Sequence, residues 1–554
     1  MENHAIKMAF IAVLALVNSC KSLEVTPTSE LGYDEGISTS AGLEGVINTA
    51  FGRFISGNGA ATYFDEILYA EAQSVKSVTR SPIAPTSGNT YELNLFNLQA
   101  NSGVLGNLSR SRYASVTAAN VVLDAIERNI PQDADIAIQK NRLMGEGYFC
   151  RGTAFFESVR FWGHQYGFNS TAPNSGIPIP LTVPVTGSIG VGRSTVEETY
   201  AQIITDLTKA TQLLPVAYDA SVHGAFPAYR FRSTRAAAFG ILARVYFQQG
   251  TDASYQKSLE AINAILGPTP GTIAATVNTG TRVYALQPFH SGTTLAAGGP
   301  FNSTGFTSAP ANSEEIIRLV NNTTTTGGYI AASANLTLES GGNPTNRGGV
   351  RWVLKRPTPD VAVTVPVTTS PLFDDVVNDR RFTVLTANNN FGTAAAPRNE
   401  RYSLKWGSQT GTLIGFQTCP MLRAGELVIT RAEINAVLNN LTAAAADYNL
   451  VRTRAGAVTK KLGDAGFTTK AEVLAEIVKE RQRELLFEGD DYWAWKRMGA
   501  YNAKNAGVYP ASEVAPFVRG GVSYNWNNNK TLLKFALDDI NLNPLMGPGT
   551  QNPD

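Results

Sequence analysis

Apolar residues recur every three or four positions along much of the chain, which is the spacing of one buried face of an α-helix. Capping residues, glycine and proline mark where these runs begin and end. The first four runs lie behind Thr39 and Ser40, between Tyr113 and Pro131, from about Ile138 to Trp162 before Gly163, and from the capping box Thr195–Glu198 to Pro215. The pattern predicts a helix in each of them.

Two later stretches each contain a pair of short helices joined by a tight turn. In Ser233–Leu266 the helical pattern is interrupted at Gly250, and Glu426–Gly456 follows the same plan. Each stretch has about the length of one tetratricopeptide unit. Helices of this kind bury their apolar faces only when neighbouring pairs stack on one another. The pattern therefore predicts a mainly α fold with a tetratricopeptide-like helical scaffold.

The last scaffold helix is predicted to begin at the capping box Thr469–Glu472 and to run to about Glu488. Arg481 falls on the same face as the apolar residues of this helix. A charge in that position must be paired or emerge at an edge. Glu484 and Glu488 follow one and two turns onward, so we expect them to be the partners of Arg481.

Residues 267–420 have a different character, because Gly, Thr, Asn, Ser and Pro dominate and only short β-prone runs occur. We expect an irregular subdomain with short strands, laid over the helices and carrying the ligand face. Aromatic side chains there could stack on sugar rings or anchor peptides, although a single aromatic residue is more often part of a core. The candidates are Trp352, Trp406, Phe306 and Tyr329, with Phe301 and Phe391 nearby.

The balance of charge argues against several classes of partner. Forty-six basic and forty-five acidic residues leave a net charge of +1, which gives no electrostatic footprint for nucleic acid. Three cysteines do not make a disulfide framework. A bridge between Cys150 and Cys419 remains open, but two buried free thiols are the simpler interpretation.

The N-terminus has the pattern of an export signal. Lys7 precedes the apolar run Met8–Val17, which ends in Asn18, Ser19 and Cys20. Ten apolar residues span only about 15 Å as a helix, which is too short to cross a bilayer. The segment up to Cys20 resembles a bacterial lipobox, so residues 1–19 are expected to be removed, Cys20 lipidated and residues 20–38 left as a tether. An ordinary signal peptide with an incidental cysteine is the alternative.

Several segments resemble the SusD/RagB family of outer-membrane nutrient-binding lipoproteins. Ile477–Arg497 is similar to its signature, a helix of the form E-R-x-R-E-L-x-F-E-G followed by an aromatic turn and K-R. Asn449–Gly456, Asp538–Pro544 and Gln551–Pro553 are similar to other segments of the family. Within the signature, Arg481, Arg483, Glu484, Glu488, Trp493 and Trp495 are expected to be structural.

The resemblance implies about four tetratricopeptide-like helix pairs, a lipid anchor on the cell surface, and a SusC-like TonB-dependent barrel that this protein covers as a lid. Combined with the pattern, it divides the chain into a helical region at 39–266, the irregular subdomain at 267–420 and a closing helical region at 421–554. The expected location is the outer membrane, with the protein facing the exterior.

Catalytic motifs are missing from the sequence. His164, His223 and His290 lie far apart, and no HExxH, P-loop or GxSxG pattern occurs. A pair of carboxylates assembled by the fold stays open, as in a hydrolase of glycans or peptides. We assign no cofactor and no metal, and we expect a binding protein rather than an enzyme.

The leading hypothesis is a surface protein that captures an oligosaccharide and passes it to the barrel. Peptide capture, as in RagB-like proteins, is the alternative within the family. A tetratricopeptide scaffold that binds only protein is the alternative outside it.

Overall fold

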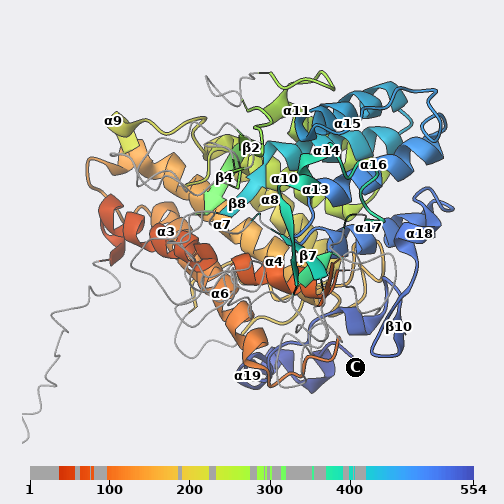
Figure 1. Ribbon diagram of the computed structural model, residues 1–554. Coiled ribbons are helices and arrows are strands. Elements are labelled where there is room, and N and C mark those ends of the chain that lie inside the picture. Colours follow the sequence, from red (N-terminus) through yellow and green to blue (C-terminus); the bar gives the residue numbers. More distant parts are fainter. Residues whose placement is uncertain are drawn as a thin grey trace, which may run out of the picture.

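The computed structural model is mainly α-helical, with short strands between the helices (Figure 1). The structure describes residues 36–55, 63–74, 77–79, 96–184, 190–223, 232–274, 284–291, 294–295, 300–301, 314–319, 352–354, 368, 370–390, 399–403, 405 and 419–553. In Figure 1 the colours run from red and orange helices on the left to blue helices at the upper right, while the last blue helix lies at the bottom, next to an orange one.

The N-terminal helices confirm the four predicted runs and extend one of them. They are α3 (Ser40–Ile55), α4 (Tyr63–Ala72), α6 (Gly103–Glu127), α7 (Ile136–Trp162) and α8 (Val196–Leu213). Helix α6 starts ten residues before the predicted run, because the side chain of Ser102 accepts a hydrogen bond from the backbone N–H of Val104 and caps it there. Helix α7 ends at Gly163, as predicted, and α8 begins with the complete capping box of Thr195 and Glu198.

The later helices include both predicted pairs. They are α9 (Ala220–His223), α10 (Arg235–Gln249), α11 (Asp252–Leu266), α13 (Arg380–Thr383), α14 (Ala424–Val437), α15 (Leu441–Ala455), α16 (Lys470–Glu484), α17 (Asp491–Lys504), α18 (Ala511–Val514) and α19 (Leu537–Leu542), with short 3-10 turns at Asn529–Thr531, Pro544–Met546 and Pro548–Thr550. Gly250 joins α10 to α11 in the left-handed conformation, with φ of 64°. Gly456 ends α15 in the same way, with φ of 75°.

Helix α16 is shorter than the sequence predicted. It ends at Glu484 rather than near Glu488, and the backbone N–H of Leu485 makes its last hydrogen bond, to the carbonyl of Arg481. Phe487 then adopts a φ of +63°, a left-handed backbone conformation that cannot continue a right-handed α-helix. The residues after Glu484 therefore point in directions that a helix would not give them.

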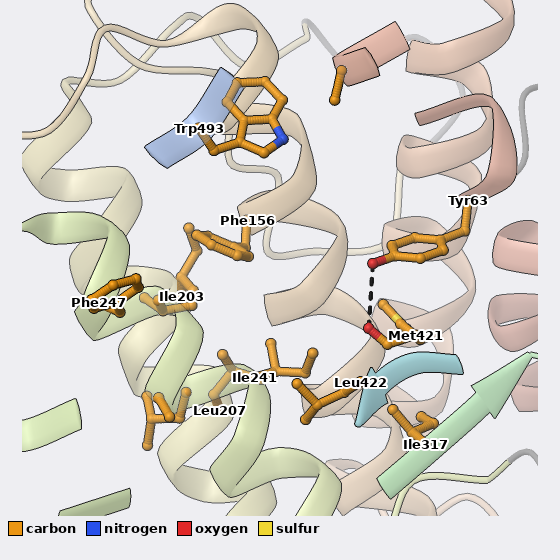
Figure 2. Packing of buried hydrophobic residues seen from close by; sticks show 14 of the residues in the cluster. Tyr63, Phe156, Ile203, Leu207, Ile241, Phe247, Ile317, Met421, Leu422 and Trp493 are labelled. Carbon is orange, nitrogen blue, oxygen red and sulfur yellow. Dashed lines mark hydrogen bonds between the residues drawn. The ribbon is translucent and has the colours of Figure 1, made fainter. Parts of the chain in front are cut away.

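Among the described residues, four successive helix pairs form the scaffold: α3 with α6, α7 with α8, α10 with α11, and α14 with α15. Each pair also packs on the next, because α6 contacts α7, α8 contacts α10 and α11 contacts α14. Figure 2 shows part of the core between them, where Ile203 and Leu207 of α8 gather with Ile241 of α10. All three side chains are fully buried. Burial of each contributes about 1.5–3 kcal/mol to folding.

The strands form short antiparallel pairs, and all but the last pair named below include residues from 267–420. The pairs are β1 (Ser77–Thr79) with β5 (Trp352–Leu354), β2 (His290–Ser291) with β3 (Thr294–Leu295), β4 (Glu315–Leu319) with β8 (Cys419–Arg423), β6 (Thr386–Asn390) with β7 (Asn399–Ser403), and β9 (Phe517–Arg519) with β10 (Val522–Tyr524). The β4–β8 pair joins this subdomain to the scaffold, because Ile317 and Leu422 enter the same core as Ile241 (Figure 2). Tyr63 of α4 also donates a hydrogen bond to the carbonyl of Met421 in β8, at 3.3 Å.

The C-terminal segment closes the scaffold at the end of α7. The indole Nε1 of Trp162 donates to the carbonyl of Lys534, at 2.9 Å. The amide of Asn552 donates in turn to the carbonyls of Trp162 and Leu533, at 2.9 and 2.7 Å. Residues more than 370 positions apart in the sequence thus complete each other's hydrogen bonds.

A buried group of charges fastens the irregular subdomain to α15 and α16. The carboxylate of Glu484 is shared by Arg423 of β8 at 2.5 Å, by Arg381 of α13 at 3.3 Å and by Arg454 of α15. Glu314, just before β4, bridges Arg423 and Arg454 at 3.0 Å from each. We call these five residues the Glu484 cluster. No side chain in the cluster is more than 4% exposed.

A second carboxylate on α16 extends the cluster by one turn. Glu480 pairs with Arg381 at 2.7 Å, and with Arg452 and Arg483 at 3.0 Å each. Burial alone opposes ionisation of both Glu480 and Glu484. The surrounding arginines outweigh that effect and hold the pKa of Glu480 below, and that of Glu484 well below, its ordinary value. Both carboxylates are therefore charged in the folded protein.

Substitution of Gly250 by alanine should destabilise the protein. The left-handed backbone costs an L-residue roughly 1–2 kcal/mol, and an added Cβ would lie 3.1 Å from Cγ of Arg497. Gly466→Ala is the matched control, because its φ is also positive, at 71°, but nothing lies within 4 Å. Urea unfolding should show a larger loss of unfolding free energy for Gly250→Ala. Equal losses would mean that the contact with Arg497 contributes nothing.

Glu484→Gln should lower the free energy of unfolding at pH 7 by about 3–5 kcal/mol, because it leaves buried arginines without their counter-charge. The folded-state pKa is depressed, so the contribution of Glu484 is present above its unfolded value of about 4.3 and is lost as the pH falls through the folded value. The free energies of unfolding of wild type and variant should be measured at a series of pH values. The difference between them should become smaller below about pH 4. Exposed Glu260→Gln, on α11, is the control, and a difference between wild type and Glu484→Gln that does not change with pH would contradict the assignment.

Candidate functional site

The predicted ligand residues fall mostly outside the described part of the chain. Trp352 lies in β5, where it stands opposite Thr79 of β1. Trp406, Phe306 and Tyr329, like Phe391, lie outside the described residues. Whether these aromatic side chains meet on one surface stays a prediction.

Phe301 is only 5% exposed, so its ring is part of the core rather than of a surface that could meet a ligand. Its ring stacks on Phe289 with centroids 5.9 Å apart. The guanidinium of Arg454 lies 3.8 Å from the centre of the Phe289 ring, while Lys405 and Arg423 lie over Phe301 at 5.0 and 5.4 Å. These cations belong to or adjoin the Glu484 cluster, so Phe289 and Phe301 are held by the same charges that fix β8.

Lys405, like Arg381, is a buried cation from the irregular subdomain, and it lies against the Glu484 cluster. Its ammonium donates to Oε1 of Glu488 at 2.6 Å and to the carbonyl of Glu484 at 2.8 Å. Burial lowers the pKa of Lys405, with Glu488 acting in the opposite direction. For Glu488, burial is outweighed by Arg423 and Lys405, which hold the pKa of its carboxyl below the ordinary value.

The prediction that Glu484 and Glu488 pair with Arg481 was wrong. Its guanidinium pairs with Asp490 at 2.5 Å and donates to the hydroxyl of Thr430 at 2.8 Å, with Glu433 at 3.8 Å. Glu484 and Glu488 instead serve Arg423 and its neighbours. The reason is the early end of α16, because the turn after Glu484 carries Glu488 away from the helix axis and brings Asp490 back to Arg481.

The remaining signature residues are buried within the scaffold. Arg483 pairs with Glu480 and donates to the carbonyl of Leu372 at 2.7 Å. Trp493 packs edge-on against Phe161 at 4.9 Å between ring centres. The indole of Trp495 donates to the carbonyl of Ala515 at 3.2 Å. These contacts join α16 and α17 to the rest of the fold.

One polar cavity lies beside these residues, bordered by α4, α7, α10 and the turn after α16. Its volume is about 50 Å³, which is room for a few water molecules and not for a sugar ring. Its walls carry balanced charges, including the pairs Arg244–Glu426 at 2.7 Å and Arg481–Asp490 at 2.5 Å. The cavity is suited to bound water rather than to a ligand.

A second cavity, of about 40 Å³, lies near the C-terminus, and we call it the C-terminal groove. Residues from four separate parts of the sequence line it: Gln73, Phe96, Asn97, Leu98, Gln99, Lys530, Leu532, Leu533, Lys534 and Pro553. Sequence reasoning missed this groove. Only the lysine spacing at 530 and 534 marks it in the sequence, and such spacing is common on protein surfaces.

The described residues also bear on three other features: a metal site, a membrane-spanning helix and the pairing of the cysteines. Among them, no group of three or more His, Cys, Asp and Glu side chains is placed to hold a metal ion. No described helix is both long and apolar enough to cross a membrane. Cys150 is a fully buried free thiol, so it does not pair with Cys419, which lies in β8. Burial raises the pKa of the Cys150 thiol well above its ordinary value.

Two models of known protein families match the chain, and together they cover more than half of it. The model described as "Starch-binding associating with outer membrane" matches residues 47–247. The model described as the SusD family matches residues 380–537. A SusD-like protein P2 of Formosa agariphila is 25% identical over 267 residues, so the match spans 47% of this chain and 46%, about half, of that relative.

Solved structures share the fold over nearly the whole chain. A SusD superfamily protein from Bacteroides vulgatus superposes with a TM-score of 0.67 at 19% identity, covering 93% of this chain and 99% of the other. Surface glycan-binding protein A from Bacteroides uniformis gives a TM-score of 0.67 at 14% identity, with the same coverage. At these identities the likeness concerns the fold, the tetratricopeptide-like helical fold of the SusD superfamily. The two family models, which match residues 47–247 and 380–537, show that this protein belongs to the SusD family.

Proposed function

We propose that this protein is a cell-surface lipoprotein that captures a glycan and passes it to a SusC-like TonB-dependent transporter in the outer membrane. The match of the two family models carries the proposal, since one of them is described by starch binding and association with the outer membrane. A structural neighbour that is named a surface glycan-binding protein supports it. The protein acts by binding, and no catalytic step is assigned to it.

The proposed ligand face lies in the irregular subdomain, residues 267–420. Trp352, Trp406, Phe306 and Tyr329 are the proposed contacts, because aromatic rings stack on the apolar faces of sugars. The described structure supports a rigid base for such a face. The Glu484 cluster and the stacked rings of Phe289 and Phe301 tie this subdomain to the helical scaffold. Ligand contacts made only when the protein covers the barrel would favour the closed state.

The anchor is proposed at Cys20, which lies outside the described residues. Two or three acyl chains on this residue would hold the protein stably, because each buried methylene contributes about 0.8 kcal/mol. Residues 20–35, rather than 20–38 as expected, would then act as a tether between the outer membrane and the folded body, because Ile37 is already buried in the core. The tether allows the body to move over the barrel while it stays attached.

Binding of the purified chain to panels of neutral oligosaccharides and of peptides tests the capture function. We expect saturable binding of an oligosaccharide without release of products, and a loss of affinity of about tenfold in Trp352→Ala, the effect of losing one stacking contact. Leu542→Ala is the control, because this side chain is 84% exposed on α19, far along the chain from the candidate face. Binding of peptides alone would favour a RagB-like collector. Release of products would reveal a hydrolase, and binding only to the barrel would indicate a scaffold.

Metabolic labelling with palmitate tests the anchor. The wild-type protein should incorporate label and fractionate with the outer membrane, whereas Cys20→Ala should do neither, because the thiol that receives the lipid is gone. Cys150→Ala serves as the control, since Cys150 is buried in α7. Equal labelling of wild type and Cys20→Ala would disprove the lipoprotein assignment.

A further inference from the structure

Three aromatic rings from distant parts of the sequence lie in a row at the edge of the core. His164 and Phe168 belong to the loop after α7, and Trp526 belongs to the turn after β10. The ring centres of His164 and Phe168 are 5.6 Å apart, and those of Phe168 and Trp526 are 5.4 Å apart. All three residues are half-buried, so the row meets solvent. We call these three residues the Trp526 platform.

The loop that carries His164 and Phe168 is fixed by hydrogen bonds. The backbone N–H of His164 donates to the carbonyl of Ser175, and that of Phe168 donates to the carbonyl of Gln165, each at 3.0 Å. The side-chain amide of Gln165 donates to the backbone carbonyl of Gln248 in α10, and the amide of Gln248 donates to Oε1 of Gln165, both at 2.8 Å. Both glutamines are buried. The two rings are therefore positioned before a ligand arrives, which lowers the cost of binding.

Trp526 is positioned by the close approach of its indole to α17. A Cβ atom added to Gly499, on α17, would overlap the indole, so only glycine leaves room for the ring at this point. The turn that carries Trp526 is closed by the backbone N–H of Asn528, which donates to the carbonyl of Asn525 at 3.0 Å. Phe168 then meets the indole edge-on, with 78° between the two ring planes.

The platform presents polar atoms that form no hydrogen bond with the described part of the chain. The imidazole of His164 has no such partner there, and neither does the indole N–H of Trp526. Burial lowers the pKa of His164 to about 4, and the nearby cations Lys496 and Arg193 act in the same direction. The imidazole is therefore neutral at pH 7, with one nitrogen that donates and one that accepts.

The residues next to the platform in the sequence add amides. Asn525 and Asn527 flank Trp526, Asn169 follows Phe168, and all three asparagines are exposed. Sugar rings have apolar faces that stack on aromatic rings, and their hydroxyls both donate and accept hydrogen bonds. Amides, indole and neutral imidazole match those hydroxyls without adding charge. This combination fits a neutral carbohydrate.

The platform is an open surface rather than a pocket. Its three rings line neither of the two cavities described above. Lys504 of α17 lies against the same loop, since its Nζ would be 2.8 Å from a Cβ on Gly167, but this lysine is exposed and its charge is screened by salt. An open row of rings accommodates the side of a long chain, whereas a pocket encloses a small ligand. The platform is therefore suited to the internal sugar units of a glycan.

We propose that the Trp526 platform is a second glycan-binding site, on which internal sugar units of a neutral glycan stack while His164 and the neighbouring amides bind their hydroxyls. The proposal rests on the glycan-capture function and extends it, because the platform lies outside residues 267–420, where the aromatic candidates are. A long chain held at two sites binds more tightly than at either alone, since the second contact is intramolecular.

Fluorine NMR of the full chain labelled with 5-fluorotryptophan tests the site directly. The chain has six tryptophans, and Trp526→Phe identifies the signal of Trp526 by its loss. Maltohexaose, laminarihexaose and xylohexaose are the neutral probes. At least one of them should shift the Trp526 signal, and the shift should persist in Trp352→Ala, because the platform does not depend on the candidate face. The signals of buried Trp493 and Trp495 should stay in place.

The affinity for the matching polysaccharide, amylose, laminarin or xylan, connects this signal to binding. Trp526→Ala should weaken binding about tenfold, the effect of one lost stacking contact. Trp526→Phe keeps an aromatic ring and should retain most of the affinity. Tyr246→Ala is the matched control, because it removes a half-buried ring on α10 and should leave affinity unchanged. Gly499→Ala keeps the indole but displaces it, so it should weaken binding as Trp526→Ala does.

Each alternative outcome has a clear meaning. A Trp526 signal that stays in place while calorimetry shows a sugar binding, or wild-type affinity in Trp526→Ala, would overturn the platform and leave glycan capture standing. A shift of the Trp526 signal by an acetylated Gly-Tyr-Gly peptide and by none of the sugars would overturn it in favour of a peptide site. If calorimetry detects no binding of any neutral sugar, glycan capture itself fails together with the platform.

Discussion

The carboxylate of Glu484 is the point at which the two halves of this fold depend on each other. It lies on a scaffold helix, yet Arg381 enters from the irregular subdomain, and Arg423 comes from β8, the strand that pairs with β4 of that subdomain. Charges taken out of water are favourable only when every one is paired. The loops can therefore hold this position only on a scaffold that is already assembled, and the scaffold can bury Glu484 only under those loops.

This arrangement explains how a loop-rich region can present a binding surface. Short antiparallel pairs such as β4–β8 have too few hydrogen bonds to be stable alone. Their stability comes from the helices below, through Ile317 and Leu422 in the core and through the cations stacked on Phe289 and Phe301. Loops that are attached in this way can vary in sequence without changing the attachment.

Local sequence signals predicted the helices well, because capping and periodicity depend on neighbouring residues. The capping boxes at Thr195 and Thr469 and the turn at Gly250 are all present in the structure. The partner of Arg481 could not be predicted, since it depends on where α16 stops, and no residue after Glu484 signals that stop. The C-terminal groove was beyond sequence reasoning for a related reason, because Gln73 and Lys530 are neighbours only after the chain has folded. The aromatic candidates for the ligand face remain predictions from residue type.

The hydrogen bonds between α7 and the last residues of the chain constrain when the protein can complete its fold. The indole N–H of Trp162 donates to the carbonyl of Lys534, and the carbonyl of Trp162 accepts a hydrogen bond from the amide of Asn552. A chain that is made from its N-terminus therefore exposes this end of α7 until its last residues have been added. Contacts across so many residues also make folding slow. A chain cut at Gln551 would lack the amide of Asn552, so the carbonyl of Trp162 would lose this donor and the end of α7 would stay open.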